Sequence, residues 1–437
     1  MPTTSTLTFD AAGFDAFLAA RPDEPEWLTA LRRDAFADAE AMQWPPRRSE
    51  EWIRTDIRTF QLHKFAPPLG PDSTEALPTV HQLREGIEPC GELETLDSRV
   101  VSESLDQAVA DKGVLFGALD RMCAEAPDKV RPHLYTVVDP SYDKFAALHA
   151  AFWSGGQFLY VPRGVVIEQP IYIGSALSDG SVDTTHTLIV LEEGAEATVI
   201  HESNSESPNA TGLHLGAVEL VQKAGSHLRY VNVQEWGHKT FHFAHQKATV
   251  DRDAQLQWTI AAMGGGLAKV NQSVDLIGPG ANSQVNGVMF TEQRQHLAYH
   301  TTQHHRAPHC HSDFLYKAAQ QDKSRTVWRG MIKVDKAAQK TDGYQRNDNL
   351  VLSHHARADS IPGLEIEADD VRCTHGSTTA QVDEEQIFYA RCRGFTRKEA
   401  TRMIVAGFFQ QIFDRITIPS VRDALGHAIA RQVREVG

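Results

Sequence analysis

The spacing of apolar residues divides the chain into a helical beginning, a strand-like middle and a helical end. From residue 9 to about 60, apolar side chains recur every three or four positions, which predicts amphipathic helices. The clearest run comprises Trp27, Leu28, Leu31, Ala35 and Phe36. Residues 66–100 are rich in Pro, Gly, Glu and Asp and are expected to be irregular. The stretch from Leu105 to about Ala126 again favours a helix.

Between about 157 and 380 the apolar period falls towards two, as is typical of strands, and turn-forming tetrads interrupt the pattern. Each tetrad follows an aliphatic residue. The aliphatic positions are Val161, Leu191, Val221, Val250, Ile277, Val334 and Leu352, with a degenerate copy near Gln303–Ala307. Most of them are about 30 residues apart. A strand-like repeat of this length predicts a β-solenoid, and a β-sandwich with evenly spaced strands is the alternative.

The last part of the chain, from Asp383 to Gly437, returns to a helical pattern. Gly394 can end a first short helix, because glycine accepts the left-handed conformation of a helix C-cap. Thr396 and Glu399 match a capping box that starts a second helix, and Pro419 starts a third. We therefore expect a helical region with an irregular segment at 1–150, a solenoid core at 151–380 and helices at 381–437.

Charge and composition disfavour several functional classes. Asp and Glu outnumber Lys and Arg by 57 to 43, so the formal net charge is −14, which argues against nucleic-acid binding and a polybasic membrane contact. No apolar run reaches the ~18 residues of a spanning helix, and the first residues lack the pattern of a secretory leader. The five cysteines are scattered and odd in number, which is unlike a disulfide framework. These features predict a cytoplasmic protein.

Histidine is unusually frequent, with 21 copies. Between residues 296 and 311 the chain carries His296, His300, His304, His305, His309 and His311, with Cys310 among them. Imidazole and thiolate suit iron or zinc, but on an extended strand His309 and His311 face away from Cys310. For 296–305 a polar, solvent-facing strand surface is the favoured interpretation. For 308–311 a metal site and a structural role remain equally open.

Cys373 and His375 form the second candidate site. On a strand these residues share one face, roughly 7 Å apart, and supply half of an iron or zinc site that a second strand or chain would complete. The structural alternative is a buried cysteine beside a hydrogen-bonded histidine. The chain has no Gly-x-x-x-x-Gly-Lys-Ser/Thr loop, so we expect no ATP hydrolysis by this chain and assign no catalytic residues.

The most specific motif is Ser360–Gly376, with the sequence Ser-Ile-Pro-Gly-Leu-Glu-Ile-Glu-Ala-Asp-Asp-Val-Arg-Cys-Thr-His-Gly. Further motifs are Glu51–Trp52, Val161–Val165, Ala307–Cys310, Gln339–Gln345, Asp383–Gly394 and Ala400–Phe408. Together they resemble the SufB/SufD family of the Suf iron–sulfur cluster assembly system, and the first resembles the signature of the D-type subunit. The resemblance implies a non-catalytic scaffold built as a right-handed parallel β-helix between N-terminal and C-terminal helices.

The same resemblance implies partners. In the family the D-type subunit pairs with the paralogous SufB across the β-helix ends, and each subunit carries the ABC-type ATPase SufC on its C-terminal helices. The candidate docking residues are Glu385, Phe388, Tyr389, Arg397, Met403 and Phe408. A role in iron acquisition is implied, with iron or a nascent cluster at the SufB–SufD interface. His375 is the better candidate ligand, beside Cys373, and reduced flavin stays open for the complex.

Several alternatives stay open at this point. The B-type subunit of the family receives sulfur on a cysteine inside the β-helix, where Cys310 is the candidate, whereas Cys373 lies in the D-type motif and favours that type. Two other functions are a free-standing β-helix polysaccharide lyase and a His-rich metal-binding module built on 296–311. An unpaired solenoid end would also permit a homodimer of the isolated chain through strand pairing.

Overall fold

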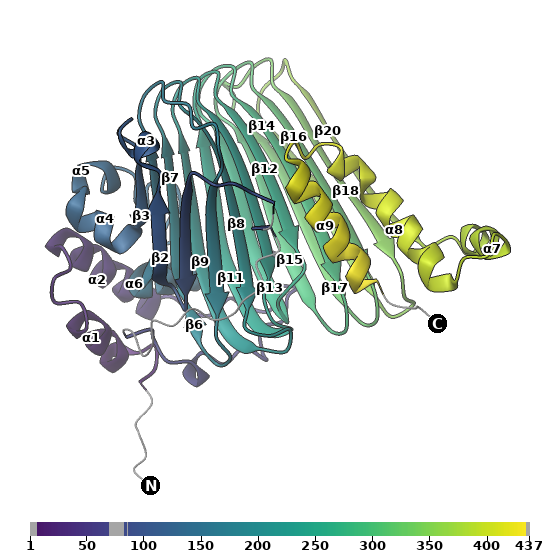
Figure 1. Cartoon of the computed structure of the whole chain (residues 1–437), viewed down its shortest axis with the longest axis horizontal. Helices are drawn as coiled ribbons and strands as arrows, with labels where there is room; N and C mark the ends of the chain where they lie inside the picture. The colour runs from purple at the N-terminus through teal and green to yellow at the C-terminus, as the bar shows by residue number, and fades with distance from the viewer. Residues whose placement is uncertain (1–6, 70–82, 85, 434–437) are drawn as a thin grey trace, which may run out of the picture.

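The computed structural model of the protein describes residues 7–69, 83–84 and 86–433. Its centre is a β-solenoid of two facing sheets, and successive strands along the chain alternate between them (Figure 1). From one turn to the next the strands pair in parallel, residue for residue, as between β12 (Gln255–Ala262) and β14 (Asn282–Thr291). The repeat of about 30 residues is therefore one turn of the solenoid, as predicted, and the β-sandwich alternative is wrong.

Each sheet is a stack of strands along the solenoid axis. The first sheet runs in the order β2 (Arg99–Leu105), β1 (Gly91–Leu96), β5 (Ile171–Leu177), β8 (Glu196–Ser205), β10 (His227–Glu235), β12, β14, β16 (His311–Gln320), β18 (Asp342–Val351) and β20 (Arg372–Gln381). The second runs β3 (Leu115–Ala118), β4 (Gly155–Val161), β7 (Thr185–Leu191), β9 (Thr211–Gln222), β11 (Lys239–Val250), β13 (Leu267–Leu276), β15 (His296–His305), β17 (Arg325–Val334) and β19 (Arg357–Ile366). The short β6 (Val182–Asp183) pairs with β9.

The predicted aliphatic repeat marks the ends of strands in the second sheet. Leu191, Val250 and Val334 are the last residues of β7, β11 and β17, and their side chains fill the space between the sheets. The degenerate copy coincides with the end of β15, where the core position is a histidine. Leu352 is the exception, because it follows β18 in the first sheet; the position in register with Val334 is Ile366. This explains the irregular final spacing.

The turns that lead from the second sheet to the first stack on one another through backbone hydrogen bonds. From the β4–β5 turn to the β17–β18 turn each contains one residue with a positive φ, which is Gly225 (+66°) in one turn and His309 (+62°) in another. The amide of Gly225 donates to the carbonyl of Arg252, and that of His309 to the carbonyl of Gln339. In the six turns from β7–β8 to β17–β18 the residue that follows is small and buried: Ala195, Ser226, Ala254, Ala281, Cys310 and Thr341.

Helices and additional strands close the N-terminal end of the solenoid. The helices are α1 (Ala11–Ala19), α2 (Glu26–Ala41), η1 (Leu62–Lys64), α3 (Gln107–Ala110), α4 (Leu119–Glu125), α5 (Pro127–Val130) and α6 (Lys144–Phe152). The periodicity near Trp27 correctly predicted α2, which buries Leu28, Ala35 and Phe36. Phe145 of α6 stacks on Phe243 of β11 with ring centroids 4.0 Å apart, and this anchors the helices to the second sheet.

Two predictions for the N-terminal region were wrong. Part of the stretch expected to be irregular forms β1 and the first two residues of β2, although residues 70–82 and 85 of it lie outside the described part of the chain. The stretch expected to be helical contains β3 between α3 and α4. The reason is tertiary: β1 pairs with β5 in parallel, and β3 pairs with β4 antiparallel, so these short segments gain their partners from later in the chain.

The C-terminal helices follow the sequence prediction closely. They are α7 (Glu384–Cys392), α8 (Arg397–Phe413) and α9 (Pro419–Gln432). Gly394 has a φ of +91° just after α7, and Thr396 and Glu399 form the predicted capping box at the start of α8. The second half of α8 and the whole of α9 pack on the outer face of the first sheet, where Phe409 and Leu425 join Leu315 in one buried cluster. Within the described residues, no helix has the length and apolar character that crossing a membrane requires.

The turn geometry predicts opposite effects of two substitutions. The left-handed conformation of residue 309 costs a non-glycine residue about 1–2 kcal/mol, and His309→Gly removes this strain. Because glycine loses more conformational entropy on folding than histidine does, we expect a net stabilisation of about 0.5 kcal/mol. Gly225→Ala introduces the same strain and should cost about 1 kcal/mol, since no atom outside the neighbouring residues lies within 4 Å of the added Cβ. Denaturant unfolding monitored by circular dichroism measures both. Destabilisation by His309→Gly would show that its side chain does more than fill the turn.

Candidate functional site

The two ends of the solenoid are finished differently. At the N-terminal end each sheet terminates in an antiparallel strand, β2 or β3, and helices cover it. At the C-terminal end the last strands are β20 and β19, each ten residues long. Within the described part of the chain each pairs with one neighbour only, β18 or β17 respectively. Two long strands therefore present one edge of backbone donors and acceptors without partners from this solenoid, which is the arrangement that invites pairing with another chain.

Cys373 and His375 lie on this last strand, on the side that faces between the sheets. Cys373 pairs in register with Gly343 and His375 with Gln345, which is fully buried one turn further in. Because no further turn covers β20, Cys373 is half-buried and His375 is exposed. Their shared face agrees with the sequence prediction. Among the described residues no group of three or more His, Cys, Asp or Glu side chains is placed to hold a metal, so this pair is at most half a site.

The thiol of Cys373 is held in its protonated form. Burial raises its pKa above the ordinary value, and the nearby carboxylate of Asp342 adds to the effect. A cysteine binds metal as the thiolate, so iron or another cation must displace this proton. Gly343 leaves room beneath the sulfur: a Cβ at this position would lie 3.4 Å from Cys373 Sγ and 3.5 Å from His305 Nε2.

The sequence analysis did not predict the polar interior next to this end. His305, which points between the sheets, contacts the hydroxyl of Ser312 at 2.7 Å, and Ser312 donates to Gln303 at 2.5 Å. Asn349 donates to Asn347 at 2.8 Å on the next turn. The core thus changes from aliphatic to polar as it approaches Cys373 and His375. Counting back about 30 residues from Cys373 in steps of one turn would have found Gly343 and Ser312.

The structure separates the members of the 308–311 motif. Cys310 is buried in the column of small turn residues and donates to the carbonyl of Gly278 at 3.3 Å, and burial raises its pKa. His309 is the exposed residue with positive φ, and His311 lies 3.9 Å from Asp342 at the edge of the first sheet. No two of these three side chains are in contact, so a metal site here would need ligands from elsewhere.

The histidines of β15 are not on a solvent-facing surface, in contrast to the favoured interpretation of 296–305. His305 lies in the core, and burial lowers its pKa to about 3. His296 points outwards but is covered by the N-terminal segment, where it lies 3.4 Å from Thr55, and burial lowers its pKa to about 4. His304 pairs with Asp335 at 2.8 Å. The difference arises because His305 points between the sheets and because the irregular segment around Thr55 packs over His296, and the local pattern reveals neither.

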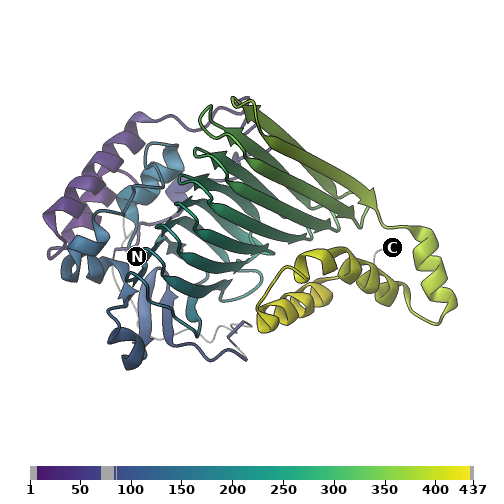
Figure 2. The same ribbon diagram turned by 90° about the horizontal axis from the view of Figure 1, so that it is seen from above.

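The candidate docking helices divide into an anchored and a projecting part. Lys317 of β16 donates to the carbonyl of Phe408 at 2.8 Å and lies over its ring, so Phe408 is held against the solenoid. In contrast, α7 and the first half of α8 extend away from the sheets (Figure 2). Glu385 is exposed there, and Arg397 pairs with Glu384 at 2.6 Å.

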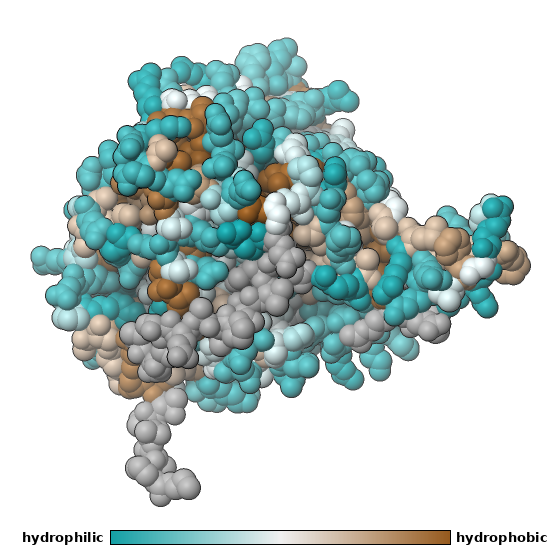
Figure 3. Space-filling model, viewed as in Figure 1, coloured by the Kyte–Doolittle hydropathy of each residue, from teal (hydrophilic) through white to brown (hydrophobic). Residues whose placement is uncertain are grey.

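Apolar side chains gather on the projecting part, where Figure 3 shows hydrophobic colour at the tip. The exposed fractions are 68% for Phe388, 60% for Tyr389, 42% for Phe395 and 54% for Met403. We call these four residues the apolar tip. Ile387 is the one residue of α7 that is buried. A nine-residue helix with so little packing is marginally stable by itself, and a gathering of exposed apolar side chains such as the apolar tip is typical of an interaction surface.

Comparison with known proteins places the chain in one system. Residues 173–408 match the family model described as SUF system FeS cluster assembly, SufBD core domain, and residues 19–173 match the SufBD protein N-terminal region. The chain is 28% identical over 315 residues to an iron–sulfur cluster assembly SufBD family protein of Staphylococcus saprophyticus and to the iron–sulfur cluster assembly protein SufB of Bacillus subtilis. Each alignment covers 72% of this chain and 68% of the relative.

The environments of the five cysteines predict an order of alkylation. Cys392 is exposed and should react first with iodoacetamide at pH 8, whereas Cys373 should react more slowly, because burial restricts access and its raised pKa leaves less thiolate. Its rate should climb as the pH rises towards that pKa. The buried Cys90, Cys123 and Cys310 should stay unmodified until the protein unfolds. Peptide mass spectrometry after timed labelling gives the order, and rapid labelling of Cys310 would contradict the buried column.

Proposed function

The chain belongs to the SufBD family of SUF iron–sulfur cluster assembly proteins, and from this we propose that it is the D-type (SufD) scaffold subunit of a SufB–SufC–SufD complex. A role in iron–sulfur cluster assembly follows from the family itself. The observation that carries the D-type proposal is the unpaired C-terminal end of the solenoid, which bears half a metal site inside the motif of Cys373, His375 and Gly376.

The proposed partner at this end is SufB. Strands β19 and β20 offer two ten-residue edges, and Leu364 and Ile366 add exposed apolar surface, at 38% and 40%. A paralogous solenoid can present matching edges, so that the two ends cover each other. Ligands from SufB would then complete the site of His375 and Cys373 for iron or a nascent cluster, which is the cargo of the complex. In the absence of SufB the same end would permit a homodimer.

The proposed partner at the apolar tip is the ABC-type ATPase SufC. Phe388, Tyr389 and Met403 provide a compact apolar contact, and Glu385 and Arg397 lie at its rim as polar groups. Aromatic side chains surrounded by polar residues are typical of the centres of protein interfaces. ATP would bind to SufC and not to this chain, and we place the complex in the cytoplasm.

The proposed role of the C-terminal helices is to couple nucleotide binding to the solenoid end. When ATP brings two SufC subunits together, α7 and the start of α8 would move with them as a lever. Because the rest of α8 is anchored on the first sheet through Phe409 and through the 2.9 Å pair of Arg415 with Asp313, the movement would reach the solenoid and change the interface with SufB. ATP can drive this change only if the complex binds it more tightly in the opened state.

The D-type assignment rests on the environments of two cysteines. A sulfur acceptor must be accessible to its donor, whereas Cys310 is buried in the turn column. Cys373, in contrast, reaches the surface at the end where a second subunit would bind. We therefore assign Cys373 as a ligand at the interface and Cys310 as a packing residue of the core.

The docking proposal predicts that Phe388→Asp uncouples SufC from the complex. A charged side chain at the centre of an apolar contact leaves an unpaired buried charge, so recovery of SufC in an anaerobic pull-down should fall at least tenfold, while SufB is retained. Ile53→Asp is the matched control, because Ile53 is 56% exposed but lies in the N-terminal region. Equal recovery of SufC with both variants would contradict docking at the apolar tip.

The interface proposal predicts that His375→Ala lowers the iron content of the assembled complex at least twofold, because one ligand is lost while the strand edges remain. Ser377→Ala serves as the control, since Ser377 lies two residues further on the same exposed strand. Iron is measured after anaerobic reconstitution, alongside the mass of the complex. An intact complex with undiminished iron would remove His375 from the site without affecting the docking proposal.

A further inference from the structure

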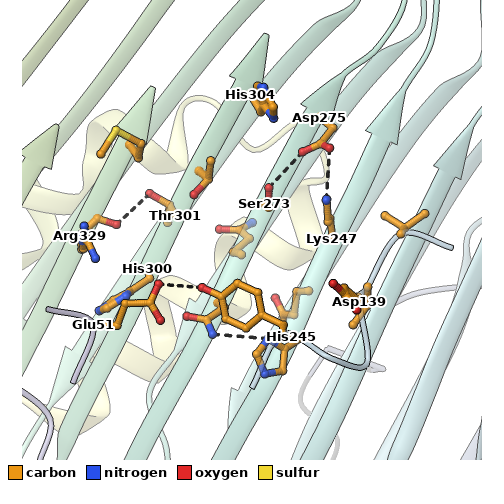
Figure 4. Close-up of a pocket in the computed structure, with 18 residues that line it drawn as sticks. Glu51, Asp139, His245, Lys247, Ser273, Asp275, His300, Thr301, His304 and Arg329 are labelled. Atoms are coloured by element: carbon orange, nitrogen blue, oxygen red, sulfur yellow. Dashed lines mark hydrogen bonds and ion pairs between the residues drawn. The ribbon is translucent and has the colours of Figure 1, made fainter. Parts of the chain in front are cut away.

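A cavity of about 380 Å³ lies on the outer face of the second sheet, away from both proposed interfaces (Figure 4). Its floor is formed by the outward side chains of β11, β13, β15 and β17, and its wall by Glu51 and the segment 137–142. We call it the outer groove. Its volume is within the range of small-molecule sites, which run from about 300 to 1,000 Å³.

The wall of the outer groove is held by two built contacts. Glu219 of β9, which is fully buried, accepts hydrogen bonds from the amides of Tyr135, Val137 and Val138 at 2.6–2.9 Å. Further along, the hydroxyl of Tyr142 donates to Glu51 at 2.8 Å. These hydrogen bonds hold the wall in one position over the sheet. The groove is therefore a fixed feature of the fold and not a gap between loose loops.

The carboxylates that line the outer groove already have partners. Glu51 accepts from Tyr142, Asp139 accepts from the amide and hydroxyl of Ser141, and Asp275 lies 3.2 Å from Lys247 and 2.7 Å from Arg306. A ligand that enters the groove thus meets few acceptors that are free to receive its protons.

The donors, in contrast, are only partly used. Arg329 is 21% exposed, and its recorded ion pair is one contact to Glu50, a residue that is 78% exposed and therefore a weak partner. Across the described chain, neither the side chain of His300 nor that of Thr302, both on β15, has a hydrogen-bond partner, and both line the groove with Arg329. Behind them, burial lowers the pKa of Lys269 to about 7. An oxyanion at this point would accept hydrogen bonds from the spare donors and favour the charged lysine.

We propose that the outer groove binds a small metabolite carrying a carboxylate or phosphate group, with Arg329, His300 and Thr302 as the donors that hold its oxyanion. The guanidinium of Arg329 keeps N–H groups available for two parallel hydrogen bonds, which is the arrangement that recognises such groups. The inference does not depend on the partners proposed above, because none of these residues belongs to the C-terminal solenoid end or the apolar tip.

Isothermal titration calorimetry on the full chain tests this site with inorganic phosphate and citrate as probes. The wild-type chain should bind at least one probe saturably with one site per chain; preference for citrate indicates a polycarboxylate and preference for phosphate a phosphorylated ligand. Arg329→Gln should weaken binding at least tenfold. The matched control is Lys333→Gln, which removes the same charge from the outer face of the same strand but outside the groove, and should change affinity less than twofold.

A second variant keeps the test independent of folding and of general charge. Thr302→Val preserves the charge and shape of the groove and should weaken binding at least threefold through the lost hydroxyl alone. Thermal unfolding curves confirm that each variant is folded. Absence of saturable binding of both probes to the wild-type chain would overturn the proposal. Equal weakening by Arg329→Gln and Lys333→Gln would also overturn it, because the anions would then respond to surface charge only.

Discussion

The structure depends on the parallel pairing of each solenoid turn with the next. A turn satisfies its backbone through its two neighbours, so the first and last turns each require something else. The chain supplies that cover at the N-terminal end, where β2 pairs antiparallel with β1, β3 pairs antiparallel with β4, and helices close the stack. At the C-terminal end the described residues supply no such cover, and Cys373 and His375 lie at this end. The unpaired end is thus the physical basis of the interface that we propose for this chain.

Stacking also decides what a residue can do, independently of its type. Cys310 lies just before β16 and Cys373 near the start of β20, yet Cys310 is enclosed by turns on either side, whereas Cys373 has a covered side and a free one. The same contrast separates His305, a core residue, from the exposed His375. Ligand chemistry in a solenoid of this kind belongs to its ends and outer faces, because the interior positions are consumed by packing.

The helices extend this logic to the rest of the molecule. At the C-terminal side the second half of α8 and α9 are anchored on the first sheet, which leaves α7 projecting with its apolar tip. On the N-terminal side, the helices and the segment fixed by Glu219 cover the second sheet and form the outer groove. The surface that we propose for a protein partner therefore lies on the side of the first sheet, and the groove that we propose for a small ligand lies on the second sheet.

Local patterns in the sequence determined the elements whose signals are local. The 30-residue repeat, the capping box of Thr396 with Glu399, and the shared face of Cys373 and His375 each depend on spacing along one segment, and all are present in the structure. Tertiary structure decided the rest. β1 becomes a strand because β5, some 80 residues later, pairs with it. His309 occupies a turn in the left-handed conformation. His296 is half-buried because the distant segment around Thr55 packs over it, and no spacing within a segment can report contacts between segments so far apart.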